Sequence, residues 1–390
     1  MIHSKSYYGS ANSIIAEELG ISLTRLGFQT TVISISPYIS YTITTENPSP
    51  NFTRVLLPYY NKYNSISNFI KRGFDLLNYY RYIDADVILS IDPILPETFL
   101  PLLVGMARRI PVVTHLTDNW GIDPDRSRHW VEGIIEEVMI FSSLKLVKQQ
   151  LYSSGLVRSR MKRYTTNQGV VIQHGFDDRE FLNTDHHYYK GWINKYLQIP
   201  KENKVVLSSL DFRLREIYIR VARQIKSEKM NVTLVLINVG SEFFDSNEID
   251  DLISEGYLRT LNRLERNEYI QVTLNSDVLW ISAADSFWDR ARYPARLSEY
   301  MATGNPIVCS LGGTAKEFLI QSGYAPISEY AFPINDVSSI LHSFSFMMSD
   351  DPRIFEATNA SFKYAKAHLT WDKIALNVAN ILNRLIEETP

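Results

Sequence analysis

The sequence of 390 residues contains a single cysteine, Cys309, so no disulfide can form within the chain. This composition fits a reducing compartment. Because Cys309 lies in a predicted buried strand, we expect it to be a small core residue rather than a reactive thiol. No apolar run approaches the roughly 20 residues that a membrane-spanning helix needs, and we expect no signal peptide. The sequence therefore predicts a cytoplasmic protein.

The chain also has almost no excess of acidic over basic residues. The formal net charge is −3, which provides no general attraction for nucleic acid. Hydrophobic residues make up 45% of the chain and charged residues 21%, a balance typical of soluble globular proteins and not of disordered ones. Since single hydrophobic cores stop growing at roughly 250 to 300 residues, this length predicts two domains.

Short apolar runs alternate with helix-like segments along the chain. This alternation predicts an α/β protein with parallel sheets that helices cover on both faces. It restarts at residue 205, which favours two doubly wound, Rossmann-like domains. The predicted strands are residues 30–36, 87–90, 112–116, 169–173, 205–209, 232–239, 278–282 and 307–310, and the predicted helices are 13–26, 97–109, 133–154, a segment ending near 229, and the tail after 371.

The beginning of the chain fits this pattern least well. A first strand should precede the polar loop at Tyr7 to Asn12, but only six residues stand there, and His-Ser-Lys-Ser is a poor buried strand. We therefore expect that the first strand is degenerate or lies upstream of the recorded start.

Residues 292–317, RYPARLSEYMATGNPIVCSLGGTAKE, form the most informative segment. It reads as a loop ending at Pro294, a helix that stops at Gly304, a buried strand over 307–310 and a second helix. The spacing of Thr314 and Glu317 predicts a capping box at the start of that helix. Glycine-rich backbone then follows the strand, at the sheet edge where open α/β folds bind nucleotides.

Two patterns resemble one enzyme family. Pro-x-Arg-x-x-Glu-Tyr-Met-Ala-x-Gly-x-Pro, from Pro294 on, resembles the donor-sugar motif of retaining GT-B glycosyltransferases of the family 4 type, in its P-x-K/R-x-x-E-Y-x-A variant. Residues 174–181, HGFDDREF, resemble the P-N-G-V-D-x-x-x-F signature that closes the N-terminal domain of this family, with Gln173 and His174 in place of Pro and Asn.

This resemblance implies a GT-B fold, in which two Rossmann-like domains face a central cleft. The implied parts are an acceptor-side domain over 1–180, a nucleotide-sugar domain over 181–365, and a C-terminal helix over 366–390 that returns to the first domain. The implied activity is metal-independent transfer of a sugar, with retention, from a UDP-sugar or GDP-sugar to an acceptor hydroxyl. The acceptor would be a carbohydrate or a lipid-linked molecule in polysaccharide or glycoconjugate synthesis.

A nucleotide-sugar donor presents a ribose diol and an anionic diphosphate. A carboxylate accepts two hydrogen bonds from the diol, and cations or backbone amides hold the diphosphate. The resemblance assigns Glu299 to the diol and Arg213 and Arg296 to the departing diphosphate. The alternatives are an Arg296–Glu299 pair within one helix and an Arg213 that is solvated at a helix start.

The resemblance also places other residues near the donor or the acceptor. His115 would face the transferred sugar, the alternative being a hydrogen-bonded loop histidine. The remaining residues that the resemblance implies are Asp118 on the acceptor side, and Gly9, Ser10, Gly313 and Thr314 beside the donor.

The family's first glutamate is missing. It would stand eight residues before Glu299, where this chain has Ala291, and Asp289 would replace it only in a shifted loop. A GT-B protein that binds without turnover is therefore the rival hypothesis. A nucleotide-sugar epimerase is a third, but no carboxylate pair is placed for it.

We expect neither a metal nor an organic cofactor. The triplets Asp84-Ala85-Asp86 and Asp123-Pro124-Asp125 are better explained as turns, and no His/Cys cluster has zinc spacing. Residues 59–82 combine four basic with many aromatic side chains, and 158–163 add a second basic run, so the sequence suggests peripheral contact with a membrane. The alternative is a solvated face above a core stripe.

Overall fold

The computed structural model describes residues 1–7, 11–36, 42–58, 74, 77–80, 84–92, 96–118, 130–167, 169–182, 192–239, 246–310, 312–324 and 328–388. The chain divides into two compact units. Unit 1 comprises Met1–Gly175, Ala291–Tyr293 and Leu369–Pro390, and unit 2 comprises Phe176–Arg290 and Pro294–His368. The first division thus falls after residue 175, where the sequence suggested 180, and the chain re-enters unit 1 at residue 369, where it suggested 366.

The described part of unit 1 is built on an eight-stranded sheet with the order β3-β4-β2-β1-β5-β6-β7-β8. Its pairs are parallel except for β3 with β4. The order steps outward from β1 in both directions, as in a doubly wound fold. The strands are β1 (Ile2–Tyr7), β2 (Thr30–Ile35), β3 (Thr44–Ser49), β4 (Phe52–Leu57), β5 (Ile88–Ile91), β6 (Val112–Leu116), β7 (Gln149–Tyr152) and β8 (Val170–Val171).

Of the two alternatives for the first strand, the structure bears out the degenerate strand, and the expectation that the first strand lies upstream was wrong. Residues 2–7 form β1, which pairs with β2 on one side and β5 on the other. Ile2 lies opposite Val32 and Leu89 and is buried in the core of unit 1. The polar sequence hid the strand because backbone pairing on both sides, rather than apolar composition, defines it.

The second correction concerns residues 149–152. The prediction extended one helix from 133 to 154, but α4 (Trp130–Leu146) ends earlier and β7 follows it. Gln150, which reads as a polar helical residue, is buried, and its amide donates to the carbonyls of Leu144 and Val147 at the end of α4. A tertiary contact of this kind overrides the local propensity.

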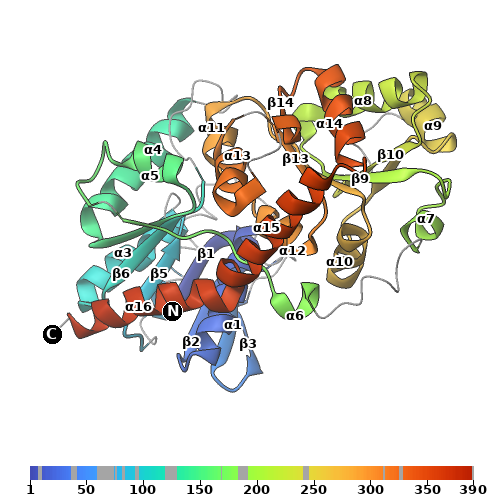
Figure 1. The fold of residues 1–390 in the computed structure, drawn as a ribbon. Helices are drawn as coiled ribbons and strands as arrows, with labels where there is room; N and C mark the ends of the chain where they lie inside the picture. The colour runs from blue at the N-terminus through green and yellow to red at the C-terminus, as the bar shows by residue number, and fades with distance from the viewer. Residues whose placement is uncertain are drawn as a thin grey trace. The chain divides into compact units, whose positions relative to one another are not determined.

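Helices of unit 1 cover its sheet, and the last helix of the chain is one of them (Figure 1). Helix α16 (Trp371–Glu387) packs its apolar face against α1 (Ala11–Arg25) in the main core cluster, where Val378 and Leu382 join Ile15 and Leu19. Gly175 has no side chain because Trp371 lies against it: an added Cβ would come within 2.7 Å of the indole. The helices are α1 (Ala11–Arg25), α3 (Pro96–Arg108), α4, α5 (Gly155–Met161) and α16 (Trp371–Glu387).

The described part of unit 2 contains a six-stranded, all-parallel sheet with the order β11-β10-β9-β12-β13-β14. This is the 3-2-1-4-5-6 order of a dinucleotide-binding fold, and helices flank the sheet (Figure 1). The strands are β9 (Lys204–Ser209), β10 (Val232–Ile237), β11 (Leu258–Leu261), β12 (Val278–Ile281), β13 (Ile307–Ser310) and β14 (Ala331–Phe332). The helices are α6 (Asp178–Phe181), α7 (Trp192–Tyr196), α8 (Arg215–Ser227), α9 (Ser246–Ser254), α10 (Arg266–Leu274), α11 (Phe287–Ala291), α12 (Leu297–Thr303), α13 (Thr314–Leu319), α14 (Val337–Met347) and α15 (Pro352–His368).

The prediction for the 292–317 segment is confirmed for its helix, its stop and its strand. Helix α12 carries Glu299 and ends at Gly304, whose φ of 72° is a left-handed C-cap. Strand β13 has the predicted bounds. These boundaries were readable because proline and glycine define them locally.

Candidate functional site

The strand order of unit 2 reverses direction between β9 and β12. In open α/β sheets, ligands bind beyond the carboxyl ends of the strands at such a point. The two loops that leave β9 and β12 start at Ser209 and Ser282. Their starts are joined by hydroxyl groups: Tyr218 Oη lies 2.6 Å from Ser282 Oγ, and Ser208 Oγ lies 3.1 Å from Ser282 Oγ. The edge that the fold favours for a ligand is therefore held in one fixed arrangement.

Arg213 joins the same two loops through charge. Its guanidinium donates to Asp289 at 2.7 and 2.8 Å in a bidentate pair, and its Nε donates to Asp211 at 2.9 Å. The Asp289 side chain has no exposed surface and also accepts a hydrogen bond from Ser286 Oγ at 2.6 Å. Hydrogen bonding to Asp211 raises the pKa of Arg213 above its usual value. Arg213, which the sequence predicts to bind the diphosphate, thus already pairs with two carboxylates. Its role in catalysis stays a prediction.

The glycine turn after β13 packs closely on this cluster. Gly312 and Gly313 have φ of 98° and 82°, where glycine is the favoured residue. A Cβ on Gly313 would come within 2.7 Å of the backbone of Arg290. The predicted capping box is wrong, because α13 begins at Thr314 with Gly313 as its N-cap. Thr314 is buried at the first helical position, one residue beyond the position that a capping box requires.

Glu299 lies on the first turn of α12, and both of its oxygens are hydrogen-bonded. Arg266 Nη1 donates to Oε1 at 2.6 Å, and Tyr269 Oη donates to Oε2 at 2.6 Å. Arg266 also donates to Glu180 through Nε and Nη2, at 2.9 and 2.6 Å. With only 13% of its side chain exposed, Glu299 is a carboxylate held in a fixed orientation.

Tyr269 connects the two charged residues of the motif. Its ring lies 5.5 Å from the guanidinium of Arg296, a cation–π distance, while its hydroxyl reaches Glu299. Burial, together with the charge of Glu299, raises the pKa of Tyr269 well above its usual value, so the phenol stays protonated and donates. Glu299 pairs with Arg266 of α10, so its partner is tertiary, and the alternative of a helix-internal pair with Arg296 is not needed to explain it.

Ala291, at the place of the family's first glutamate, is a core residue of unit 1. It is fully buried in a cluster with Leu116, Leu144 and Tyr152. Its carbonyl accepts a hydrogen bond from Ser154 Oγ at 2.6 Å, and Ser154 also caps α5 by accepting from Val157 N. This apolar environment explains why the position carries a methyl group.

The carboxyl edge of the unit 1 sheet holds His115, near the end of β6. Only 2% of this residue is exposed, and its ring meets His174 edge to face at 6.1 Å. His174 in turn meets Tyr293 at 5.4 Å. In this structure His115 is thus a packed interior residue rather than the loop histidine of the alternative, and its role toward the sugar stays a prediction.

The two histidines predict a pH dependence of stability. Burial lowers the pKa of His115 to about 4, although the charge of Asp92 acts to raise it. Burial, together with the charges of His115 and Arg292, lowers the pKa of His174 to about 3. Both values lie below the unfolded value of about 6.5, so the unfolded chain binds more protons. The histidine contribution is therefore complete above pH 6.5 and is lost as the pH falls towards 4, at up to about 1.4 kcal/mol per pH unit for each group.

Urea unfolding at pH 7.5, 6 and 5 measures this dependence. We expect the unfolding free energy to fall over this range and to fall less steeply in His174→Phe, which keeps an aromatic ring at the site. An identical slope in the variant would show that other groups cause the loss.

Asp92 is a buried residue that the sequence analysis missed. It follows β5 with a φ of 49°, and its carboxylate accepts from the backbone N–H of Thr117 at 2.8 Å and from its hydroxyl. An aspartate directly after a buried strand and before Pro93 was the signal in the sequence. Asp118 is the next residue but one after β6, so the predicted acceptor-side residue lies at the same edge.

Several other predicted residues and segments cannot be compared with the structure, or only in part. Gly9, Ser10, the triplet at 123–125 and most of the basic aromatic stretch 59–82 lie outside the described residues. In the second basic run, Arg160 and Arg163 pair with Glu137. Among the described residues, no three His, Cys, Asp or Glu side chains are grouped so that they could hold a metal. No helix in the described ranges is long and apolar enough to cross a membrane.

Comparison with known proteins gives the fold. No protein-family model and no curated protein sequence matches the chain. Among solved structures, sucrose-phosphate synthase from Thermosynechococcus elongatus is similar with a TM-score of 0.74 at 14% identity, over 99% of this chain and 98% of that one. HepE from Anabaena, in complex with UDP-glucose, is similar with a TM-score of 0.71 at 13% identity, over 98% of both chains.

A UDP-N-acetylglucosamine 2-epimerase is also similar, with a TM-score of 0.59 at 12% identity over 98% of this chain and 94% of that one. Identities this low carry the architecture and not the activity. The likeness extends over nearly the whole chain in each case, so the α/β fold with two parallel-sheet units is that of the GT-B glycosyltransferases.

Proposed function

We propose that this protein is a glycosyltransferase that moves a sugar from a nucleoside diphosphate sugar to an acceptor hydroxyl. The donor would bind at the carboxyl edge of the unit 2 sheet, where β9 and β12 diverge. HepE, which has the same fold, is described in complex with UDP-glucose, and this supports a UDP-sugar as the first donor to test. A family 4 type, a retaining course and independence of metal are parts of the proposal.

One observation carries the proposal: the orientation of Glu299. A helix between parallel strands runs antiparallel to them, so the first turn of α12 lies at the edge where the strands end. There the carboxylate is fixed by Arg266 and Tyr269. A carboxylate has about four lone-pair sites, so two donors leave acceptor capacity for a ribose diol. This fixed geometry is what a binding site needs to limit the entropy lost on association.

The proposed reaction breaks the bond between the anomeric carbon and the diphosphate oxygen. The diphosphate leaves with the electron pair, the acceptor oxygen bonds to the anomeric carbon on the same face, and its proton passes to the departing diphosphate. Stabilisation of that developing charge would be the largest catalytic contribution. Arg296 is the better candidate for it, because Asp211 and Asp289 offset the charge of Arg213.

Calorimetric titration with UDP, GDP, ADP and their sugars tests the donor site. We expect Glu299→Ala to weaken the binding of the selected nucleotide at least tenfold, since a hydrogen bond to a charged group contributes about 1.5 to 3 kcal/mol. Arg266 retains Glu180 in this variant, so no charge is left unpaired.

Glu180→Ala is the matched control, because it removes the other carboxylate from the same guanidinium and leaves Glu299 in place. We expect nearly wild-type affinity for it. Equal losses in the two variants would assign the effect to the Arg266 network, and an unchanged affinity in Glu299→Ala would sink the donor-site assignment.

A second function, binding without turnover, is favoured by Ala291. No carboxylate stands at that position, and its environment is apolar. Slow hydrolysis of the donor without an acceptor separates the two functions: a transferase releases the nucleoside diphosphate, whereas a binding protein returns the donor intact. A carbohydrate or lipid-linked acceptor, a cytoplasmic location and contact with a membrane surface are further parts of the proposal.

A further inference from the structure

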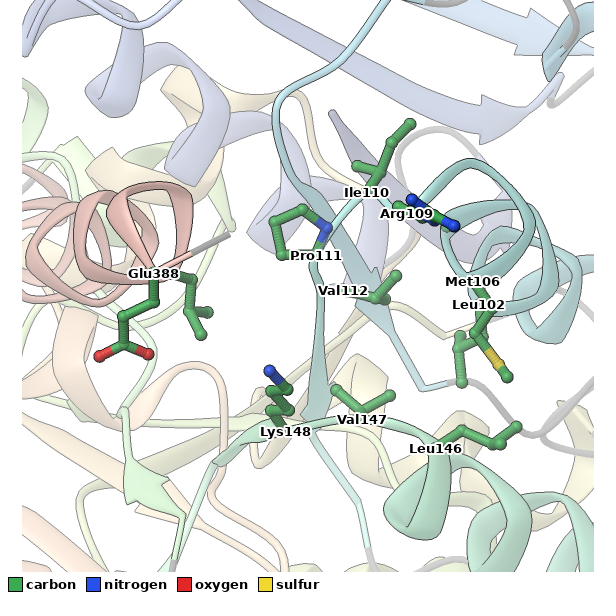
Figure 2. Close-up of a pocket in the computed structure, with 12 residues that line it drawn as sticks. Leu102, Met106, Arg109, Ile110, Pro111, Val112, Leu146, Val147, Lys148 and Glu388 are labelled. Atoms are coloured by element: carbon green, nitrogen blue, oxygen red, sulfur yellow. The ribbon is translucent and has the colours of Figure 1, made fainter. Parts of the chain in front are cut away.

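Unit 1 has a pocket at the edge opposite the carboxyl ends of its strands. It has a volume of about 200 Å³ and lies where β6 begins, between the ends of α3, α4 and α16 (Figure 2). Its walls are mainly apolar, with Leu102, Ile110, Val112 and Val147 among them. No residue of the donor-site proposal lines it, so it is a separate feature of the molecule.

The apolar surface continues outside the pocket. Met106 and Leu146 line it and are 51% and 40% exposed, and Leu103 on the same helix as Met106 is 45% exposed. Exposed apolar residues that gather around a hollow mark an interaction site more often than singly scattered ones do. The volume exceeds the roughly 150 Å³ of an apolar cavity that holds benzene, so a chain or ring of about six to eight carbons fits.

Charge at the pocket is predominantly positive. Arg109 and Lys148 line it together with Glu388, as Figure 2 shows. In the described part of the chain neither Arg109 nor Lys148 makes an ion pair, which leaves both available to a ligand.

Three helix ends oppose this charge. Each contributes about half a negative charge at its C-terminus. The last turns of these three helices and the residues just after them carry three more basic than acidic side chains. This excess is about twice the negative charge of the three helix ends together. The basic residues are Arg108, Arg109, Lys145, Lys148 and Arg384, and the acidic ones are Glu387 and Glu388.

We propose that this pocket binds an amphiphile with one anionic head group and an apolar tail, the tail lying against Leu102, Val112 and Val147 and the head group meeting Arg109 and Lys148. The shared chemistry is that of a soluble alkyl phosphate or carboxylate and of an anionic lipid in a bilayer. The site is independent of the donor site, so it stands or fails separately from the proposed function.

Arg109 offers a substitution that keeps the backbone. It directly follows α3 with a φ of 58°, and Ile110 N donates to Gly105 O at 2.8 Å across the turn. Glycine adopts this conformation readily. Lys229 follows the C-cap of α8 in the same conformation, with a φ of 53° and Met230 N donating to Ile225 O at 3.1 Å. Lys229→Gly is therefore a matched control that removes a cation away from the pocket.

Calorimetry of the full chain with octyl phosphate, octanol and inorganic phosphate tests the site. We expect saturable binding of octyl phosphate, at least tenfold weaker binding of octanol and of inorganic phosphate, and at least a fivefold loss in Arg109→Gly but none in Lys229→Gly. Equal binding of octanol, or no saturable binding of octyl phosphate, would overturn the proposal.

Leu146→Trp tests the apolar part by placing an indole at the pocket. Leu376→Trp, at a similarly exposed leucine of α16 that does not line the pocket, is its control. We expect octyl phosphate binding to fall at least tenfold only in the first variant, and equal binding in the two would contradict a tail within the pocket.

Vesicle flotation separates the two sources. Binding to phosphatidylglycerol vesicles, not to phosphatidylcholine vesicles, with loss in Leu146→Trp, assigns the site to a bilayer lipid. Octyl phosphate binding without vesicle binding assigns it to a soluble amphiphile.

Discussion

Ala291→Glu, which places a glutamate where the motif that this segment resembles has one, is expected to destabilise the protein and not to increase turnover. The methyl group is fully buried among Leu116, Ile140, Leu144 and Tyr152, so the added carboxylate would be placed among apolar side chains. An unpaired buried charge costs about 3 to 5 kcal/mol. The larger side chain would also overpack the cluster, which commonly costs a further 1 to 3 kcal/mol, roughly.

Urea unfolding of the wild-type protein and of Ala291→Glu measures the loss of stability. Ala367→Glu is the matched control. Ala367 lies exposed in α15, where a glutamate remains solvated. We expect that control to unfold at nearly the wild-type urea concentration. A folded Ala291→Glu protein with faster donor hydrolysis would contradict the assignment of this position to the core, and would show that the end of α11 can present a side chain to the donor.

Local signals explain what the sequence predicted well. Pro294, Gly304 and the apolar run before Ser310 define α12 and β13 within a few residues of each boundary, so no distant contact was needed. The same holds for the alternation that predicted both sheets. Strand β1 was missed because its polar sequence pairs with residues about 30 and 90 positions away, and only the assembled sheet shows it.

The site was harder to predict for the same physical reason. The motif pointed to Glu299, but its partners Arg266 and Tyr269 stand 33 and 30 residues earlier on another helix. The spacing of Arg296 and Glu299 suggested a pair within one helix, and the structure instead places the ring of Tyr269 beside both residues. A motif therefore identifies the residue on its own helix, while the residues that orient it come from elements that the fold brings beside that helix.

The Arg213–Asp289 pair illustrates this limit, because the sequence offered Asp289 only as a replacement for the missing glutamate in a shifted loop. In the structure its carboxylate is buried and holds the loop after β9 to the segment after β12, with Ser286 as a further donor. Its position at the sheet's switch point means that both loops depend on it. The pair should therefore contribute to stability before it contributes to any chemistry.

Asp289→Ala is expected to lower the unfolding free energy by about 2 to 4 kcal/mol. Removing one partner of a buried pair costs roughly 3 to 5 kcal/mol, and the loss is smaller here because the Arg213 side chain is 35% exposed and retains Asp211. Asp351→Ala is the control: Asp351 binds Arg353 two residues later, as Asp211 binds Arg213, but on the exposed surface.

We expect a smaller loss in that control, because its exposed pair contributes little and the change otherwise removes only the hydrogen bond that Asp351 accepts from Arg353 N at the start of α15. Urea unfolding measures both variants, and hydrogen exchange of the amides of Asp211 and Arg213 reports on the loop itself. Faster exchange there in Asp289→Ala, with wild-type exchange in β10, would show that the pair fixes the loop at the switch point. Equal unfolding free energies in the two variants would mean that the bidentate contact adds nothing, and Arg213 would then be available to a diphosphate without a stability cost.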